Sequence, residues 1–77
     1  MPGELLSRLT TAAATRMPVT VIRDDGTRAA GTVVAVAITY CVVRGPDAVD
    51  RRVELRDVAE ILRRDGRRFY PPREARP

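Results

Sequence analysis

The hydrophobic residues near the start of the chain repeat with the spacing of an α-helix. One stripe of such a helix would collect Leu5, Leu6, Leu9, Ala12 and Ala13. Glu4 falls in the first turn, where the helix dipole favours an acid. Pro18 ends the pattern, because the residue before a proline is disfavoured in a helix. The sequence therefore predicts a helix over about residues 4 to 15.

A different pattern, typical of β-strands, follows the helix. The stretch PVTVIR at residues 18 to 23 is rich in β-branched residues and predicts a strand. Asp25 and Gly26 then form a short hairpin signal, because both turn positions tolerate positive φ. Residues 27 to 44 are almost uninterrupted by polar residues and lack a helical period, which predicts two strands or one sharply bent strand. Gly31 allows the bend, because a glycine inside a strand permits a kink or a close backbone approach.

The rest of the apolar pattern predicts two more strands. The loop GPDAVD at residues 45 to 50 contains turn residues, and RRVELR at residues 51 to 56 alternates polar with apolar positions. Asp57 and Val58 predict a tight corner, after which AEIL begins a fifth strand. The predicted fold class is therefore mainly β with an N-terminal helix, in which five short strands form a small sheet that closes on itself.

The last part of the chain, residues 64 to 77, is predicted to be a basic Arg/Pro-rich tail outside a domain of residues 1 to 63. A second Asp-Gly pair lies at residues 65 and 66 between two pairs of arginines, so the fifth strand could extend into another hairpin ending at Tyr70. Three prolines in the last seven residues predict an extended or disordered end from Pro71 onward.

The charge distribution sets this tail apart from the body of the chain. The protein has 77 residues, a length that suits one domain, and a net charge of +4. Residues 1 to 62 contain eight arginines and eight acids, whereas residues 63 to 77 contain six arginines against Asp65 and Glu74. A basic excess in a tail indicates an anionic partner, although a solvated terminus explains it about as well.

The residue types present argue against an enzyme and against a cofactor or metal. The chain has no His and a single Ser, Ser7, so neither a Ser-His-Asp nor a Cys-His arrangement can be assembled. The lone Cys41 lies in an apolar stretch, where a cysteine acts as a small hydrophobe, and it cannot form an internal disulfide. No apolar run reaches the length of a membrane span. We therefore expect a cytoplasmic protein without a membrane partner.

The glycines at 26 and 31 do not predict a phosphate-binding loop of the P-loop or dinucleotide type. Such a loop needs a helix directly after its glycines, so that the helix N-terminus meets the anion. Here Thr32, Val33 and Val34 follow Gly31, and a strand is predicted instead.

Taken together, these features resemble the Sm/LSm superfamily of small SH3-like barrels, and most closely the Hfq family of bacterial RNA chaperones. The resemblance covers about residues 4 to 63 and rests on Pro18, Gly26, Gly31 and the stretch VELRDVAEIL at residues 53 to 62. It implies a five-stranded barrel, binding of single-stranded RNA in post-transcriptional regulation, and a homo-oligomeric ring closed through the fourth and fifth strands.

The same resemblance suggests candidate RNA-binding residues. At positions that match the family's RNA-contacting residues, this chain keeps the arginines Arg16, Arg28 and Arg56. It has apolar residues at other matched positions, among them Leu5, Ile22, Ala30 and Ile38. The tail adds a basic and aromatic group, which could contact phosphates and stack on bases. Its members are Arg63, Arg64, Arg67, Arg68, Phe69 and Tyr70. Phe69 and Tyr70 could instead pin the tail onto the barrel.

A looser resemblance leads to a second functional hypothesis. The DDG turn and the later VELRDV are similar to the pattern of the Rof family, Sm-like antitermination proteins that bind the termination factor Rho. That similarity implies a protein-binding module directed at the transcription machinery. If residues 63 to 70 fold back as a sixth strand, they would cover the edge needed for a ring, and a monomer or dimer would follow.

Overall fold

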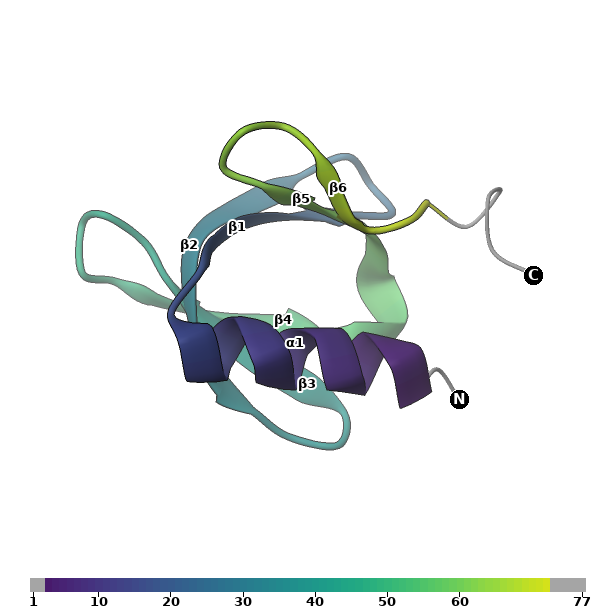
Figure 1. The fold of residues 1–77 in the computed structure, drawn as a ribbon, viewed down its shortest axis with the longest axis horizontal. Helices are drawn as coiled ribbons and strands as arrows, with labels where there is room; N and C mark the ends of the chain where they lie inside the picture. Colours follow the sequence, from purple (N-terminus) through teal and green to yellow (C-terminus); the bar gives the residue numbers. More distant parts are fainter. Residues whose placement is uncertain (1–2, 73–77) are drawn as a thin grey trace.

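The computed structural model describes residues 3 to 72 of the chain. Its elements are α1 (Gly3–Thr15), β1 (Pro18–Arg23), β2 (Arg28–Val36), β3 (Tyr40–Arg44), β4 (Asp50–Glu54), the 3₁₀ turn η1 (Leu55–Asp57), β5 (Val58–Arg63) and β6 (Arg68–Tyr70). The six strands form one antiparallel sheet in the order β4-β3-β2-β1-β5-β6 (Figure 1). The protein is therefore mainly β with an N-terminal helix, as the sequence predicts, and has one strand more than the five expected.

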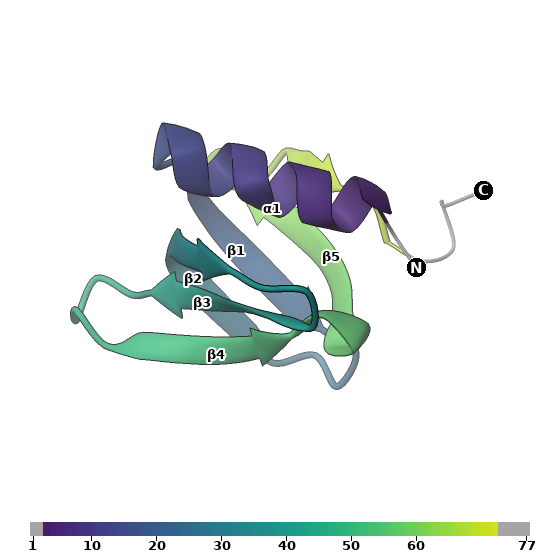
Figure 2. The ribbon, with the colours of Figure 1, turned by 90° about the horizontal axis from the view of Figure 1, so that it is seen from below.

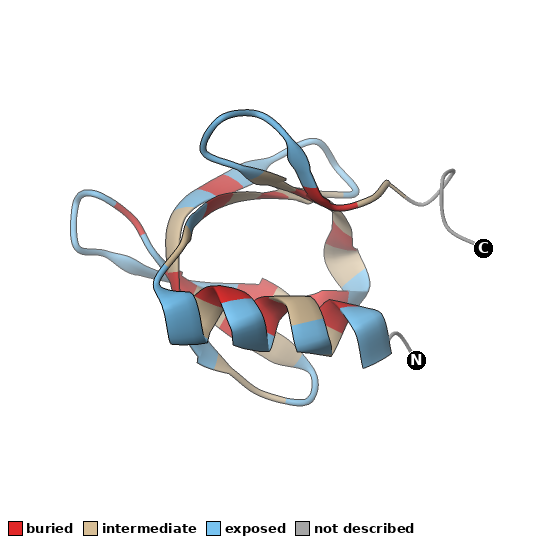
Figure 3. Cartoon of the chain, viewed as in Figure 1, coloured by how far each residue is buried: buried red, intermediate tan, exposed pale blue. Residues whose placement is uncertain are grey.

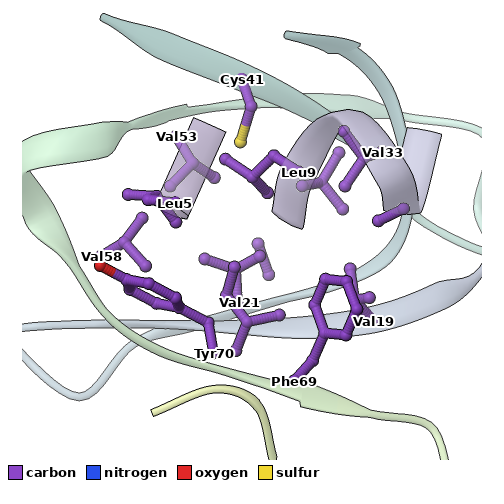
Figure 4. Close-up of a cluster of buried hydrophobic side chains, with 14 of the residues drawn as sticks. Leu5, Leu9, Val19, Val21, Val33, Cys41, Val53, Val58, Phe69 and Tyr70 are labelled. Atoms are coloured by element: carbon purple, nitrogen blue, oxygen red, sulfur yellow. The ribbon is translucent and has the colours of Figure 1, made fainter. Parts of the chain in front are cut away.

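The sheet curves around a hydrophobic interior that α1 covers. Figures 1 and 2 show β1, β5 and β6 on one side of this interior and β3 and β4 on the other. Leu5, Leu9 and Ala12 form the buried face of α1, which packs against β2 and β6 (Figure 3). In Figure 4 the two leucines point between the side chains of β2, β3 and β4 and the rings of Phe69 and Tyr70. The helical stripe predicted from the sequence is therefore confirmed as a core-facing surface.

Gly31 packs directly against the end of β3. Its φ is +152°, and a Cβ at this position would overlap the carbonyl oxygen of Arg44. A few residues further along, the pairing of β2 with β3 is irregular between Val33 and Ala35. Residues 27 to 44 thus form two strands, and the predicted special role of Gly31 is confirmed as a close backbone approach.

The corner before β5 lies earlier than the sequence indicates. β4 ends at Glu54, and the residues expected at the end of that strand, Leu55 and Arg56, belong to η1. The N–H of Leu55 donates to the Thr39 carbonyl at 3.0 Å, so the backbone leaves the strand while Leu55 stays buried. Alternation of apolar and polar residues fits both conformations, which is why the pattern placed this corner two residues late.

The hairpin that the sequence suggests as an alternative after β5 is present. The N–H of Arg63 donates to the Arg67 carbonyl at 2.7 Å, and Gly66, with φ +87°, donates to the Arg63 carbonyl at 2.9 Å. β6 then pairs with β5 and places Phe69 and Tyr70 in the core, with 5% and 1% of their surfaces exposed. The folded unit therefore continues through Tyr70, beyond the boundary expected at residue 63. Of the segment expected to be extended or disordered, residues 73 to 77 lie outside the described part.

Because β6 pairs with β5, it occupies the edge that the expected ring would use. β5 has β1 on one side, and on the other side Ile61 and Leu62 pair with Tyr70 and Arg68. The edge left open at the far end of the sheet, β4, has charged residues at four of its five positions, which disfavours strand addition.

We therefore expect the purified protein to be monomeric. Multi-angle light scattering should give a mass near 8.5 kDa at all loading concentrations. A mass several times larger would show that a ring forms in spite of β6. A mass that rises with concentration to twice the monomer value would indicate pairing through β4.

Candidate nucleic-acid interface

The arginines named from the sequence lie in two groups, one near each end of β1. Near Pro18, Val19 pairs with Arg63, and Arg16 lies two residues before the strand. At the other end, Ile22 pairs with Arg28. The N–H of Asp24 donates to the Asp57 carbonyl at 2.8 Å, which places the neighbouring Arg56 at this end as well. The structure therefore brings Arg16, Arg63, Arg64 and Arg67 to one end of the sheet and leaves Arg28 and Arg56 at the other (Figure 1). Arg68 lies on β6, where its Nε is 3.4 Å from Glu60 Oε2.

We call the end near Pro18 the arginine end, and it contains the side chains Arg16, Arg44, Arg63, Arg64 and Arg67. They come from the end of α1, the end of β3, the end of β5 and the β5–β6 turn. Two hollows lie between these elements. The helix hollow, of about 520 Å³, is lined by Ala13, Arg16, Thr32, Val33, Val34 and Arg44.

The second hollow adjoins the first, because Thr32 and Arg44 line both. We call it the sheet hollow; its volume is about 400 Å³, and Arg64 lines its wall. Arg16, Arg44 and Arg64 thus line two hollows that meet at Thr32 and Arg44.

Several of these arginines have no carboxylate partner. Within residues 3 to 72, this holds for Arg16, Arg63 and Arg64. Arg44 donates to Asp50 through Nε at 2.7 Å and Nη2 at 3.2 Å, and Arg67 lies 3.7 Å from Asp65. The hydrogen bonds from Arg44 hold the pKa of the Asp50 carboxyl below its ordinary value of 3.8, so this pair stays ionised at neutral pH. The arginine end is consequently positive.

Arg16 occupies a backbone position that usually belongs to glycine. It has φ +53° directly after α1, and the N–H of Met17 donates to the Ala12 carbonyl while that of Arg16 donates to the Ala13 carbonyl. These two hydrogen bonds close the helix as a Schellman motif, in which the residue with left-handed backbone conformation is most often Gly. A side chain there costs about 1 kcal/mol relative to glycine. The Schellman motif fixes the position of Arg16 between α1 and β1.

Phe69 and Tyr70 do not join the arginines as stacking surfaces. Both rings lie in the core, where Leu5, Leu9 and Val21 surround them (Figure 4). Phe69 instead packs under the arginines, since the guanidinium carbons of Arg8 and Arg63 lie 5.6 Å from its ring centre. Of the two roles left open for these residues, the structure shows the one in which they pin the tail to the domain.

The sequence did not predict the positions of two arginines, Arg44 and Arg52. Arg44 stands in an apolar strand and reaches the arginine end only because it pairs with Thr32 across the sheet. The Arg52 guanidinium lies 3.9 Å from the Tyr40 ring centre and donates to Glu54 at 2.7 Å on the outer face of β3 and β4. No local pattern signals either contact, because both depend on strand register.

The other reactive side chains of residues 3 to 72 include one cysteine, Cys41. Burial raises the pKa of the Cys41 thiol to about 11, and this side chain lies in the core as the sequence predicts. The described residues contain no group of three or more His, Cys, Asp or Glu side chains that could hold a metal. No helix of residues 3 to 72 has both the length and the apolar character that crossing a membrane requires.

No protein-family model matches the chain. The curated proteins give no match either. The resemblance to Sm-like proteins therefore rests on the residues that carry it, and the candidate interface rests on the geometry of the arginine end.

Proposed function

We propose that the protein binds single-stranded RNA at the arginine end and acts as a post-transcriptional regulator without catalytic activity. The observation that carries this proposal is the convergence of Arg16, Arg44 and Arg64, from three separate elements, around the two adjoining hollows. Guanidinium groups donate to phosphate oxygens in a planar fork and also stack on bases, so one surface can follow a strand of RNA.

The Sm-like barrel forms part of the same proposal. The helix, the hairpin at Gly26, the special position of Gly31 and the corner before β5 are the features on which the resemblance rests, and each is present. Three of the family's adenine-contacting and uridine-contacting positions hold Ile22, Ala30 and Ile38 here, which offer no side-chain hydrogen bonds. We therefore propose binding that depends on phosphate contacts and has little preference between A-rich and U-rich strands.

The affinity of the protein for RNA should fall steeply with salt and depend on the arginine end. In fluorescence anisotropy with short A-rich and U-rich RNA, a surface that contacts three or four phosphates gives a slope of log K against log salt of about −2 to −3. Arg64→Ala should weaken binding about fivefold and make this slope shallower by about 0.7, because one phosphate contact is lost. Arg16→Gly should have a similar effect although it relieves backbone strain.

Arg28→Ala is the matched control, because it removes the same charge from an exposed arginine without a carboxylate partner within residues 3 to 72. We expect it to weaken binding less than twofold, since it lies outside the arginine end. Equal losses from Arg28→Ala and Arg64→Ala would contradict the proposed location. The absence of any anisotropy change with micromolar protein at low salt would overturn RNA binding.

A protein-binding function is the second candidate, and one observation favours it. β4 has a hydrogen-bonding partner on one side, β3, so its other edge can accept a strand from a protein of the transcription machinery. Its charged residues, Asp50, Arg51, Arg52 and Glu54, disfavour the addition of an apolar strand, so the partner strand would carry complementary charges. Failure of the RNA experiment would make this edge the leading candidate.

A further inference from the structure

The sheet hollow has a floor of small side chains on the outer face of β1 and β2. Two cross-strand pairs build it, since Thr20 lies opposite Ala30 and Pro18 lies opposite Thr32. These positions alternate with the core residues Val19, Val21 and Ala29, so they face outward. Gly45 and Pro46 at the start of the β3–β4 loop form one wall, and Arg64 contributes to another.

Close backbone packing positions Arg44 beside this floor. The Arg44 carbonyl lies against Gly31 at a separation that no Cβ would permit. A Cβ at Gly45 would come within 2.7 Å of Asp47 Oδ1 and 3.0 Å of an Arg51 nitrogen. Gly31 thus lets the end of β3 approach β2, where Arg44 pairs with Thr32, and Gly45 leaves room for Asp47 and Arg51 in the β3–β4 hairpin.

The groups that line the sheet hollow favour an anion over a cation. The lining residues include two arginines and two threonines, and no Asp or Glu is among them. Asp50 occupies Nε and one hydrogen of Nη2 on Arg44, which fixes the plane of its guanidinium and leaves the Nη1 hydrogens free to donate. Arg64 contributes a complete set of donors, since it has no carboxylate partner within residues 3 to 72.

We propose that the sheet hollow binds one phosphate group of a nucleotide unit. Arg44 and Arg64 donate to the phosphate oxygens, and the hydroxyls of Thr20 and Thr32 provide uncharged donors below them. Pro18 and Pro46 give the rim apolar contact area for a sugar or base. This inference deepens the proposed RNA binding and rests on it. The phosphate can belong to the backbone of a strand, to its 5′ end or to a free nucleotide, and these share the same chemistry.

The glycines of the hollow provide a direct readout. In ¹⁵N-labelled protein, the amide signals of Gly31 and Gly45 should shift on titration with inorganic phosphate or UMP at constant ionic strength set with chloride. Gly3 and Gly26 lie outside the hollow and should not shift. Two charge-assisted donors fit half-saturation in the millimolar range for a single phosphate. Oligonucleotides with a 5′-phosphate and with a 5′-hydroxyl then distinguish a terminal phosphate from the backbone.

Two substitutions on the same face of β2 test the location. Ala30→Glu puts a carboxylate on the floor of the hollow, whereas Ala35→Glu adds the same charge at an exposed outward position opposite Val42. The first should raise the phosphate concentration at half-saturation about tenfold, and the second should change it less than twofold. If Ala30→Glu does not fold, the isosteric pair Thr20→Val and Thr32→Val, which should weaken phosphate binding about threefold, decides the matter.

Each outcome bears on the proposal. Shifts at Gly31 and Gly45 that Ala30→Glu removes and Ala35→Glu keeps would support a phosphate site. Absence of these shifts with both inorganic phosphate and UMP, or their persistence in Ala30→Glu, would overturn it. If RNA binding still depends on Arg16 and Arg64 while the glycine signals stay unmoved, RNA binding stands and the phosphate site fails.

Discussion

Gly31→Ala is expected to lower the free energy of unfolding by about 3 kcal/mol or more. The new Cβ would overlap the backbone carbonyl of Arg44, and a backbone atom cannot rotate away as a side-chain end can. The residue also has φ +152°, which L-residues rarely adopt. A domain of this length has a total stability of roughly 4 to 12 kcal/mol, so a loss of this size removes a quarter or more of it, and the urea midpoint should fall markedly.

Gly26→Ala is the matched control for this experiment. Gly26 also has positive φ, +86°, but a Cβ there meets nothing within 4 Å. The loss should therefore be about 1 kcal/mol, which reflects backbone conformation alone. Equal losses at the two glycines would show that the contact with Arg44 does not limit the fold.

Tyr70→Ala should have an effect of similar size, about 3 to 5 kcal/mol, because it removes a fully buried ring. The ring packs beside Leu5 and Val21, so its loss leaves a cavity between α1 and β1 (Figure 4). It also weakens the attachment of β6 to β5, since Tyr70 pairs with Ile61. Chemical denaturation monitored by far-UV circular dichroism measures the change.

Tyr70→Phe separates packing from RNA contact. It keeps the ring, so the free energy of unfolding should fall by at most about 1.5 kcal/mol. RNA affinity should equal that of the unmodified protein, because this residue lies in the core and not at the arginine end. A stable Tyr70→Ala protein that had lost RNA binding would instead assign the ring to the interface.

The parts of the fold that depend on single residues could be predicted from the sequence. Pro18 ends a helix, Asp25-Gly26 forms a turn and Gly31 permits close approach, because each acts on its own backbone. β6 could only be left open as an alternative, since three residues are too few for a periodic pattern. The corner predicted at Asp57 and Val58 was two residues late, because Leu55 is buried whether it belongs to a strand or to η1.

The candidate site could be predicted less completely, because it depends on strand register. Arg16 and Arg64 were named from the sequence, but their proximity to Arg44 follows from the pairing of Thr32 with Arg44 and from packing at Gly31. Arg28 and Arg56 match family positions and yet lie at the other end of β1. Spacing along the chain cannot show which end of a curved sheet a side chain occupies.

The placement of Leu5 and Tyr70 in one core also bears on how the protein folds during synthesis. These residues come from α1 and β6, the first and last described elements of the chain, so the core contains contacts of nearly maximal sequence separation. Such contacts form late and slow the folding reaction. A nascent chain that ends before residue 68 has an unpaired β5 edge and an incomplete core, and we expect it to be prone to aggregation until β6 leaves the ribosome.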